Sequence, residues 1–128
     1  MDDEKVVQIT DKEELENIIN MIKSYNKSQY NFTTWYWKRL FLRGMEHERI
    51  LEILQEYDKI FLIEKRKLKF GDIGYELFYK LNINSSLSIA IIPLKNKIEF
   101  IHAIEYKRNL DKRIKDLIEY PKEGILSK

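Results

Sequence analysis

Apolar residues recur at the spacing of an amphipathic helix in the first half of the chain. The first such stretch predicts a helix that begins at residue 11 and ends near residues 26–28. Its apolar stripe consists of Leu15, Ile18, Ile19 and Ile22. Thr10 or Asp11 can cap the helix start, and Asp11 with Glu14 three residues later resembles a capping box. Residues 6–9 precede this helix as a short extended segment.

Two further helices are predicted before the middle of the chain. One covers residues 34–43, where Thr33 and Thr34 can cap its start and Gly44 ends it. Its aromatic residues, Trp35, Tyr36, Trp37 and Phe41, fall on more than one side of the helix. The other covers residues 46–57. Its apolar stripe consists of Ile50, Leu51, Ile53, Leu54 and Tyr57.

The second half of the chain has the pattern of a small sheet. Runs rich in β-branched and aromatic residues predict strands over residues 60–67, 74–81, 87–94 and 98–106. The short loops between them favour an antiparallel meander. A closing helix over residues 110–119 begins after Asn109 and ends before Pro121. The predicted fold is therefore α+β, with N-terminal helices packed on a four-stranded antiparallel sheet and a C-terminal helix.

Length and composition favour one domain and remove several classes of site. The 128 residues are expected to form a single domain, with an N-terminal extension over 1–32 and an α+β core over 33–120. The absence of cysteine excludes disulfides and thiolate zinc sites, and the two histidines are too few for a histidine-rich metal cluster. A carboxylate magnesium site stays open, but we predict neither a metal nor a cofactor. No signal peptide or membrane-spanning run is present, which predicts a cytoplasmic protein without a membrane partner.

The predicted second helix carries two arginines that suit phosphate binding. Arg39 and Arg43 are four residues apart and so lie on one helical face. Two guanidinium groups on one face can hold phosphate oxygens in a bidentate manner. The alternative is that both pair with Glu46, Glu48 or sheet carboxylates as structural ions.

A basic run near the end of the first predicted strand suggests contact with a nucleic acid. We assign nucleic-acid binding to Arg43 and to Lys65, Arg66, Lys67, Lys107 and Arg108. Aromatic residues are interleaved with the basic ones, namely Phe70, Tyr75, Phe78 and Tyr79. Bases stack on exposed aromatic rings while lysines follow the backbone. The alternative is that these rings belong to the core and the lysines form a solvated rim.

The last predicted strand supplies the candidate acid–base residue. Alternation places Phe100, His102 and Ile104 on one face of that strand, and Tyr106 lies near its end. A histidine can act as a general base near neutral pH. The alternative is a hydrogen-bonded core or edge histidine. His47, in the first turn of a predicted helix, is expected on the surface.

Residues 33–108, about 60% of the chain, resemble the small prokaryotic toxin-like domains grouped with RelE, barnase and the colicin ribonucleases. The likeness rests on Arg39, on the turn Arg43-Gly44-Met45 and on the following helix from Ile50 to Leu54. It also rests on the order of the Tyr75-Glu76-Leu77 and Ile98–Tyr106 strands. The resemblance implies metal-independent cleavage of RNA. Trp35 stands where the pattern usually has a histidine, which favours binding over catalysis.

Three functions therefore follow from the sequence. The first is a prokaryotic or archaeal toxin-like domain that binds nucleic acid, with RNA as the preferred ligand. The second is a metal-independent ribonuclease in which Arg39 binds phosphate, His102 is the base and Tyr106 or Lys107 stabilises the transition state. The third is a protein-interaction module. It would use Trp35, Trp37 and Phe41 to bind an antitoxin-like partner or a second copy.

Overall fold

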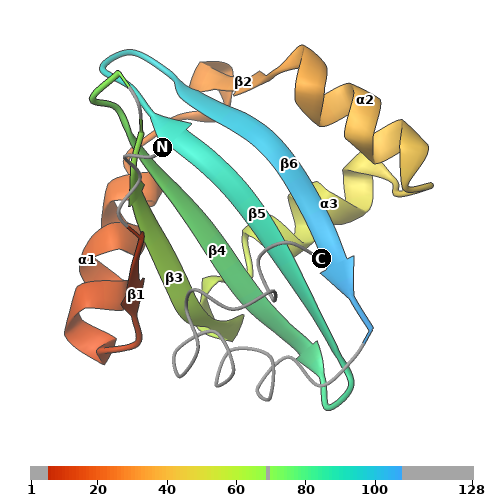
Figure 1. Ribbon diagram of the computed structural model, residues 1–128, viewed down its shortest axis with the longest axis horizontal. Coiled ribbons are helices and arrows are strands. Elements are labelled where there is room, and N and C mark those ends of the chain that lie inside the picture. The colour runs from red at the N-terminus through yellow and green to blue at the C-terminus, as the bar shows by residue number, and fades with distance from the viewer. Residues whose placement is uncertain (1–5, 69, 108–128) are drawn as a thin grey trace.

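The computed structural model describes residues 6–68 and 70–107, which form one mixed sheet with three α-helices against one of its faces (Figure 1). The strands are β1 (Val6–Ile9), β2 (Tyr30–Phe32), β3 (Ile60–Lys67), β4 (Ile73–Asn82), β5 (Ser85–Pro93) and β6 (Ile98–Tyr106). The α-helices are α1 (Lys12–Lys23), α2 (Thr34–Leu42) and α3 (His47–Leu54), and short 3-10 turns cover Lys27–Gln29 and Tyr57–Lys59. Within the described ranges, no helix is both long and apolar enough to cross a bilayer.

The sheet differs from the predicted one in size and in strand direction. Its six strands are ordered β1-β3-β4-β5-β6-β2. The predicted antiparallel meander forms from β3 to β6, and β1 extends it by pairing antiparallel with β3. At the other edge, β2 pairs parallel with β6.

The prediction of a four-stranded antiparallel sheet was therefore wrong. β1 coincides with the extended segment predicted over residues 6–9, but its pairing with β3 was not predicted. β2 has three residues, too few for a periodic signal, and its partner lies far along the chain. Pairing of Tyr30 with Ile98 makes β2 a strand only in the tertiary structure. The predicted C-terminal helix over residues 110–119 lies outside the described residues.

The starts of α1 and α2 follow from local chemistry. The Asp11 carboxylate accepts a hydrogen bond of 3.1 Å from the amide of Glu14, and the Thr33 hydroxyl accepts one of 3.2 Å from the amide of Tyr36. After α2, Gly44 takes a φ of +65°, a conformation that favours glycine at a helix end. Both helices therefore begin at the predicted caps, although α1 ends earlier than predicted.

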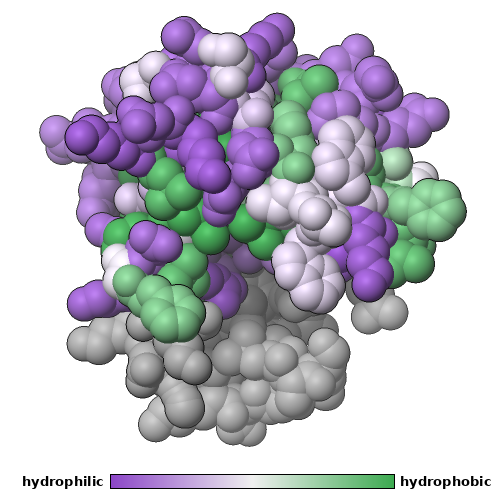
Figure 2. All heavy atoms as spheres, turned by 90° about the horizontal axis from the view of Figure 1, so that it is seen from above, coloured by the Kyte–Doolittle hydropathy of each residue, from purple (hydrophilic) through white to green (hydrophobic). Residues whose placement is uncertain are grey.

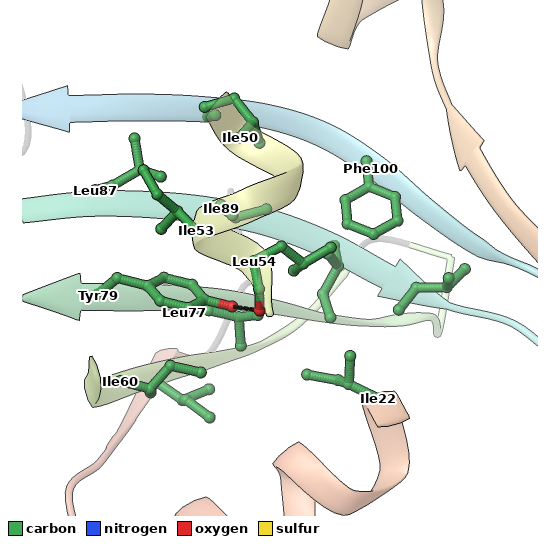
Figure 3. Packing of buried hydrophobic residues seen from close by; sticks show 14 of the residues in the cluster. Ile22, Ile50, Ile53, Leu54, Ile60, Leu77, Tyr79, Leu87, Ile89 and Phe100 are labelled. Atoms are coloured by element: carbon green, nitrogen blue, oxygen red, sulfur yellow. Dashed lines mark hydrogen bonds between the residues drawn. The ribbon is translucent and has the colours of Figure 1, made fainter. Parts of the chain in front are cut away.

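One hydrophobic core joins the three helices to the sheet. Figure 3 shows its residues from α1, α3 and the sheet. Ile22 of α1 and Ile50 of α3 pack in the same cluster as Leu77 and Ile89 of the sheet. Tyr79 is fully buried there, and its hydroxyl donates a hydrogen bond of 2.9 Å to the Leu54 carbonyl at the end of α3. Because Leu15 and Ile9 belong to the same cluster, the N-terminal segment shares the core of the rest of the described chain.

Candidate functional site

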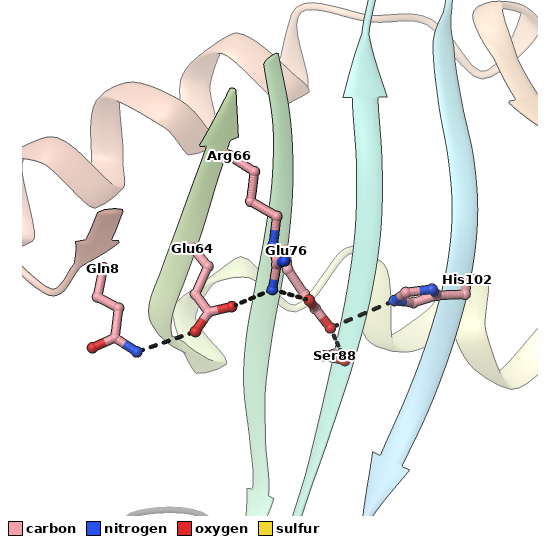
Figure 4. Close-up of polar contacts among 6 residues, drawn as sticks. All are labelled: Gln8, Glu64, Arg66, Glu76, Ser88 and His102. Atoms are coloured by element: carbon pink, nitrogen blue, oxygen red, sulfur yellow. Dashed lines mark hydrogen bonds and ion pairs between the residues drawn. The ribbon is translucent and has the colours of Figure 1, made fainter. Parts of the chain in front are cut away.

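The face of the sheet that does not carry α1, α2 and α3 holds a row of polar side chains (Figure 4). We call this face the second face and the row the polar row. The row consists of Gln8, Glu64, Arg66, Glu76, Ser88 and His102. The strand register explains it, because Gln8 lies opposite Glu64, Glu64 opposite Glu76, and Ala90 links Glu76 to His102. Strand pairing thus brings together residues from β1 to β6.

Glu64 and Arg66 form the β1 side of the polar row. Gln8 Nε2 donates a hydrogen bond of 3.1 Å to Glu64 Oε2, and Arg66 Nη2 donates one of 3.0 Å to Glu64 Oε1. The same Arg66 nitrogen lies 3.7 Å from Glu76 Oε1. Arg66, a predicted nucleic-acid contact, is therefore held between two carboxylates.

Glu76 is the central group of the polar row. It is buried and accepts a hydrogen bond of 2.7 Å from the Ser88 hydroxyl. Burial acts to raise the pKa of Glu76. Contact with the His102 imidazole, the hydrogen bond from Ser88 and the positive charge of Arg66 outweigh burial, so the pKa is lowered. Glu76 is thus a carboxylate at neutral pH.

His102 projects from β6 toward Glu76 on the second face (Figure 4). Phe100 lies in the core on the other face, so the predicted alternation of Phe100 and His102 was wrong, because the register shifts between Ala90 and Ile91 of β5. The Nε2 atom of His102 lies 3.5 Å from Glu76 Oε2 and has no hydrogen-bond partner of good geometry among residues 6–68 and 70–107. This distance suits an ion pair but is long for a hydrogen bond. A small ring movement would let Nε2–H donate to Glu76, which would leave Nδ1 as the proton acceptor. The side chain is 21% exposed, so the ring is not sealed from solvent.

At the β6 edge, the end of α2 meets the strand that carries His102. Arg43 Nη1 donates a hydrogen bond of 3.0 Å to the Ala103 carbonyl. Beside this contact lies a groove of about 610 Å³, which we call the edge groove. It is lined by Arg43, Gly44, Met45, Glu46, Arg49, Ile104, Glu105 and Lys107. The groove therefore joins the α2–α3 turn to the end of β6.

Of the two arginines in the edge groove, Arg49 pairs with a carboxylate, whereas Arg43 bonds to a backbone carbonyl. Arg49 Nη1 lies 2.7 Å from Glu105 Oε1, a contact that lowers the pKa of Glu105. Burial and the nearby Arg39 lower the pKa of Arg43, while Tyr106 and Glu76 act in the opposite direction. Arg43 thus lies within electrostatic reach of the polar row. Its guanidinium still bears a positive charge, since arginine is not deprotonated in proteins.

The other predicted site residues are divided between separate places. Arg39 lies over the ring of Trp35, with its Cζ 5.0 Å from the ring centroid, rather than in the edge groove. Lys65 and Lys67 are exposed on β3, which β4 and β5 separate from β6. Lys107 lines the edge groove, and Arg108 lies outside the described residues.

The aromatic residues proposed for base stacking are divided in the same way. Phe78 and Tyr79 are buried and Tyr75 is half-buried, whereas Phe70 is exposed. The alternative that most of these rings are core residues is therefore correct. Tyr106 is half-buried on the second face, with its ring centroid 6.4 Å from that of Phe78.

No sequence pattern indicated Glu76 and Ser88 as site residues. That they lie near His102 of β6 is known only once the register of β4, β5 and β6 is known. His47 was expected on the surface, but its Nδ1 lies 2.8 Å from the hydroxyl of buried Tyr36 and its ring packs on Phe32. A single histidine in a helix gives no sequence signal for such a contact.

No family model matches this sequence, and neither a curated protein nor a solved structure is detectably similar to it. Among residues 6–68 and 70–107, no cluster of three or more histidine, aspartate or glutamate side chains is arranged to hold a metal ion. The site is therefore interpreted from its own chemistry, which consists of a carboxylate–histidine pair beside a cationic groove.

Proposed function

We propose that this chain binds RNA at the β6 edge. The observation that carries the proposal is the hydrogen bond from Arg43 to the Ala103 carbonyl, because it fixes a cation at the end of α2 against the backbone of β6, one residue along the chain from His102. Lys107 adds a second exposed cation to the edge groove. Phosphates pair well with guanidinium and ammonium groups, so a strand of RNA that followed this groove would pass the polar row.

The likeness to toxin-like ribonuclease domains agrees with this location. Arg43 belongs to the turn on which that resemblance rests, and His102 and Tyr106 belong to the last strand. Tyr106 lies next to Lys107 and on the second face, where an unstacked base could contact its ring. Lys65 and Lys67 take no part in the proposed site, because they lie near the opposite edge of the sheet.

Cleavage of the bound RNA is a second candidate function, favoured by the Glu76–His102 pair. In this reaction the 2′-hydroxyl oxygen attacks the adjacent phosphorus, and its proton passes to Nδ1 of His102. The bond from phosphorus to the 5′ oxygen breaks, which leaves a 2′,3′-cyclic phosphate. The departing 5′ oxygen takes a proton from the imidazolium or from water. Glu76 would stabilise the imidazolium, and Arg43 would stabilise the charge on the phosphate.

Binding can be tested by fluorescence anisotropy with a labelled single-stranded RNA over a series of salt concentrations. We expect the affinity to fall with salt, because phosphate contacts release counterions. In the double variant Arg43→Ala/Lys107→Ala, the affinity should fall about tenfold or more and the salt slope should become smaller by about 1–2 units. The matched control is Lys65→Ala/Lys67→Ala, which removes two cations from β3 and should leave both quantities unchanged. Absence of binding, or an equal loss in the control, would contradict the proposal.

Cleavage needs a separate readout. If the chain is a ribonuclease, His102→Ala abolishes cleavage of the labelled RNA while the anisotropy titration is preserved. Glu76→Gln should reduce cleavage and change its pH dependence, because an amide cannot stabilise the imidazolium as a carboxylate does. RNA that the unsubstituted chain binds but leaves intact would reject cleavage and retain the binding proposal.

A further inference from the structure

The outward side of α2 is unusually apolar for a helix in contact with water. Four large side chains are exposed there, Trp35 by 57%, Trp37 by 47%, Phe41 by 84% and Leu42 by 72%. We call these four residues together with Lys38 and Arg39 the α2 patch. Viewed from above, apolar and weakly polar side chains reach the surface at the end of the molecule that α2 occupies (Figure 2).

Most of these side chains lie outside the core. Tyr36 and Leu40 are the buried residues of α2, and of the four exposed apolar residues only Trp37 also packs its ring on Phe32 and His47 in the described part of the chain. A helix that packs by one stripe normally carries polar residues on the opposite side. Clustered apolar residues at such positions mark interaction surfaces. The apolar side chains of the α2 patch therefore indicate a contact outside the described fold.

The charge of the α2 patch has one sign. Lys38 Nζ lies 5.7 Å from the centroid of the Trp35 ring, and Arg39 Cζ lies 5.0 Å from it. Both distances are within the range of cation–π contacts, so the ring has two positive groups near it. No acidic residue occurs between Thr34 and Leu42. The surface thus combines large apolar side chains with positive charge that no acidic residue of the helix offsets.

We propose that the α2 patch docks a protein segment that presents apolar and acidic side chains together, as an acidic amphipathic helix does. Apolar residues of the segment would cover Phe41 and Leu42, and its carboxylates would pair with Lys38 and Arg39. Tryptophan and arginine are the residues that most often dominate the binding energy of protein interfaces.

Two other occupants fit the α2 patch less well. A second copy related by a twofold axis would bring the Lys38 and Arg39 side chains of both copies to one interface, and like charges placed together oppose association. Single-stranded RNA would use the rings and the cations. It would leave Leu42, an aliphatic side chain 72% exposed, without a suitable partner.

The two tryptophans of the chain provide a direct measurement. Trp35 and Trp37 are its only tryptophans, and both belong to the α2 patch, so emission excited where only tryptophan absorbs reports this surface. The probe is a synthetic helical peptide without tryptophan, with leucine on one face and glutamate on the other. We expect a saturable blue shift of the emission as the peptide covers the rings. A peptide with lysine in place of each glutamate should bind about tenfold more weakly or not at all.

Variants of exposed side chains make the test specific. Phe41→Ser/Leu42→Ser should weaken binding of the glutamate peptide about tenfold or more, because the apolar contact is lost. Ile83→Ser is the matched control, since Ile83 is 80% exposed in the turn between β4 and β5, and it should leave binding unchanged. Circular dichroism checks that each variant keeps its fold.

Three results would overturn the proposal. The first is equal binding of the glutamate and lysine peptides, or binding of neither. The second is a concentration-dependent dimer in analytical ultracentrifugation that Phe41→Ser/Leu42→Ser abolishes, which would assign the α2 patch to a second copy. The third is RNA that changes the tryptophan emission and competes with the peptide. Failure of this docking leaves the RNA proposal intact, because that proposal is tested with Arg43→Ala/Lys107→Ala.

Discussion

The guanidinium of Arg43 lies 3.0 Å from the carbonyl oxygen of Ala103 and so ties the end of α2 to the edge strand β6. β2 pairs with residues 98–100 of β6 and extends no further along that strand. Past this point, α2 runs beside β6, and Arg43 satisfies a main-chain acceptor that an edge strand would otherwise present to solvent. The same contact holds a positive charge next to the edge groove.

Loss of this contact should have a modest effect on stability. We expect Arg43→Ala to lower the free energy of unfolding by about 1 kcal/mol, because water can replace part of the hydrogen bond at a partly exposed site. Lys38→Ala, on the outer side of the same helix, should change it by less than about 0.5 kcal/mol. Urea denaturation of both variants measures the difference. Equal losses would show that Arg43 does not anchor α2.

The buried hydroxyl of Tyr79 should contribute more than a partly exposed one. Tyr79→Phe removes the donor to the Leu54 carbonyl and leaves that oxygen without its partner in the core, which should cost about 1–3 kcal/mol. Tyr25 provides the comparison, because its hydroxyl donates to the Leu94 carbonyl at a half-buried position. Tyr25→Phe should cost less, since water can reach the vacated carbonyl. Thermal or urea unfolding compares the two variants, and a larger loss for Tyr25→Phe would contradict this ranking.

Stability should depend on pH through Glu76. The pKa of Glu76 in the folded chain lies below its ordinary value of 4.5, so the unfolded chain binds a proton that the folded chain does not. The stabilisation by the ionised carboxylate is complete above that value and is lost as the pH falls through the folded-state pKa. Glu76→Gln removes this titration. The acid slope of its unfolding free energy should therefore be smaller by at most about 1.4 kcal/mol per pH unit.

Glu105 is the control for this pH dependence. Its hydrogen bond to Arg49 also lowers its pKa, but the pair lies at the surface, where solvent screens the interaction. Glu105→Gln should therefore reduce the acid slope less than Glu76→Gln does. Urea unfolding at several acid pH values measures both slopes. An unchanged slope in Glu76→Gln would show that the polar row does not depend on the charge of Glu76.

The turn after α2 should tolerate volume but not a change of backbone preference. A Cβ atom on Gly44 would meet no heavy atom within 4 Å, so Gly44→Ala adds no clash. The positive φ still costs an alanine about 1 kcal/mol, and Gly44→Asn should cost less because asparagine tolerates this conformation. Thermal unfolding ranks the three proteins. Equal stability of the alanine variant and the unsubstituted chain would indicate that the turn relaxes to a negative φ.

The predictions that succeeded rest on short-range patterns. Asp11 and Thr33 act as helix caps because each capping bond spans three residues. The four long strands were predicted because their residue types and short connections favour a meander. The strand β2 was not predicted, because it has three residues and forms its hydrogen bonds with β6, far along the chain.

The sequence by itself determined the helix starts, the meander from β3 to β6 and the apolar residues available for a core. It also identified His102, Arg43 and Lys107 as candidate site residues. Only the tertiary structure decided that Glu76 faces His102, that Arg43 reaches β6, and that Arg39 lies against Trp35 instead of in the edge groove. The physical reason is the separation in sequence over which each interaction acts. Caps and alternation act between neighbours in sequence, whereas pairing across a sheet depends on strand register, which the packing of the whole core selects.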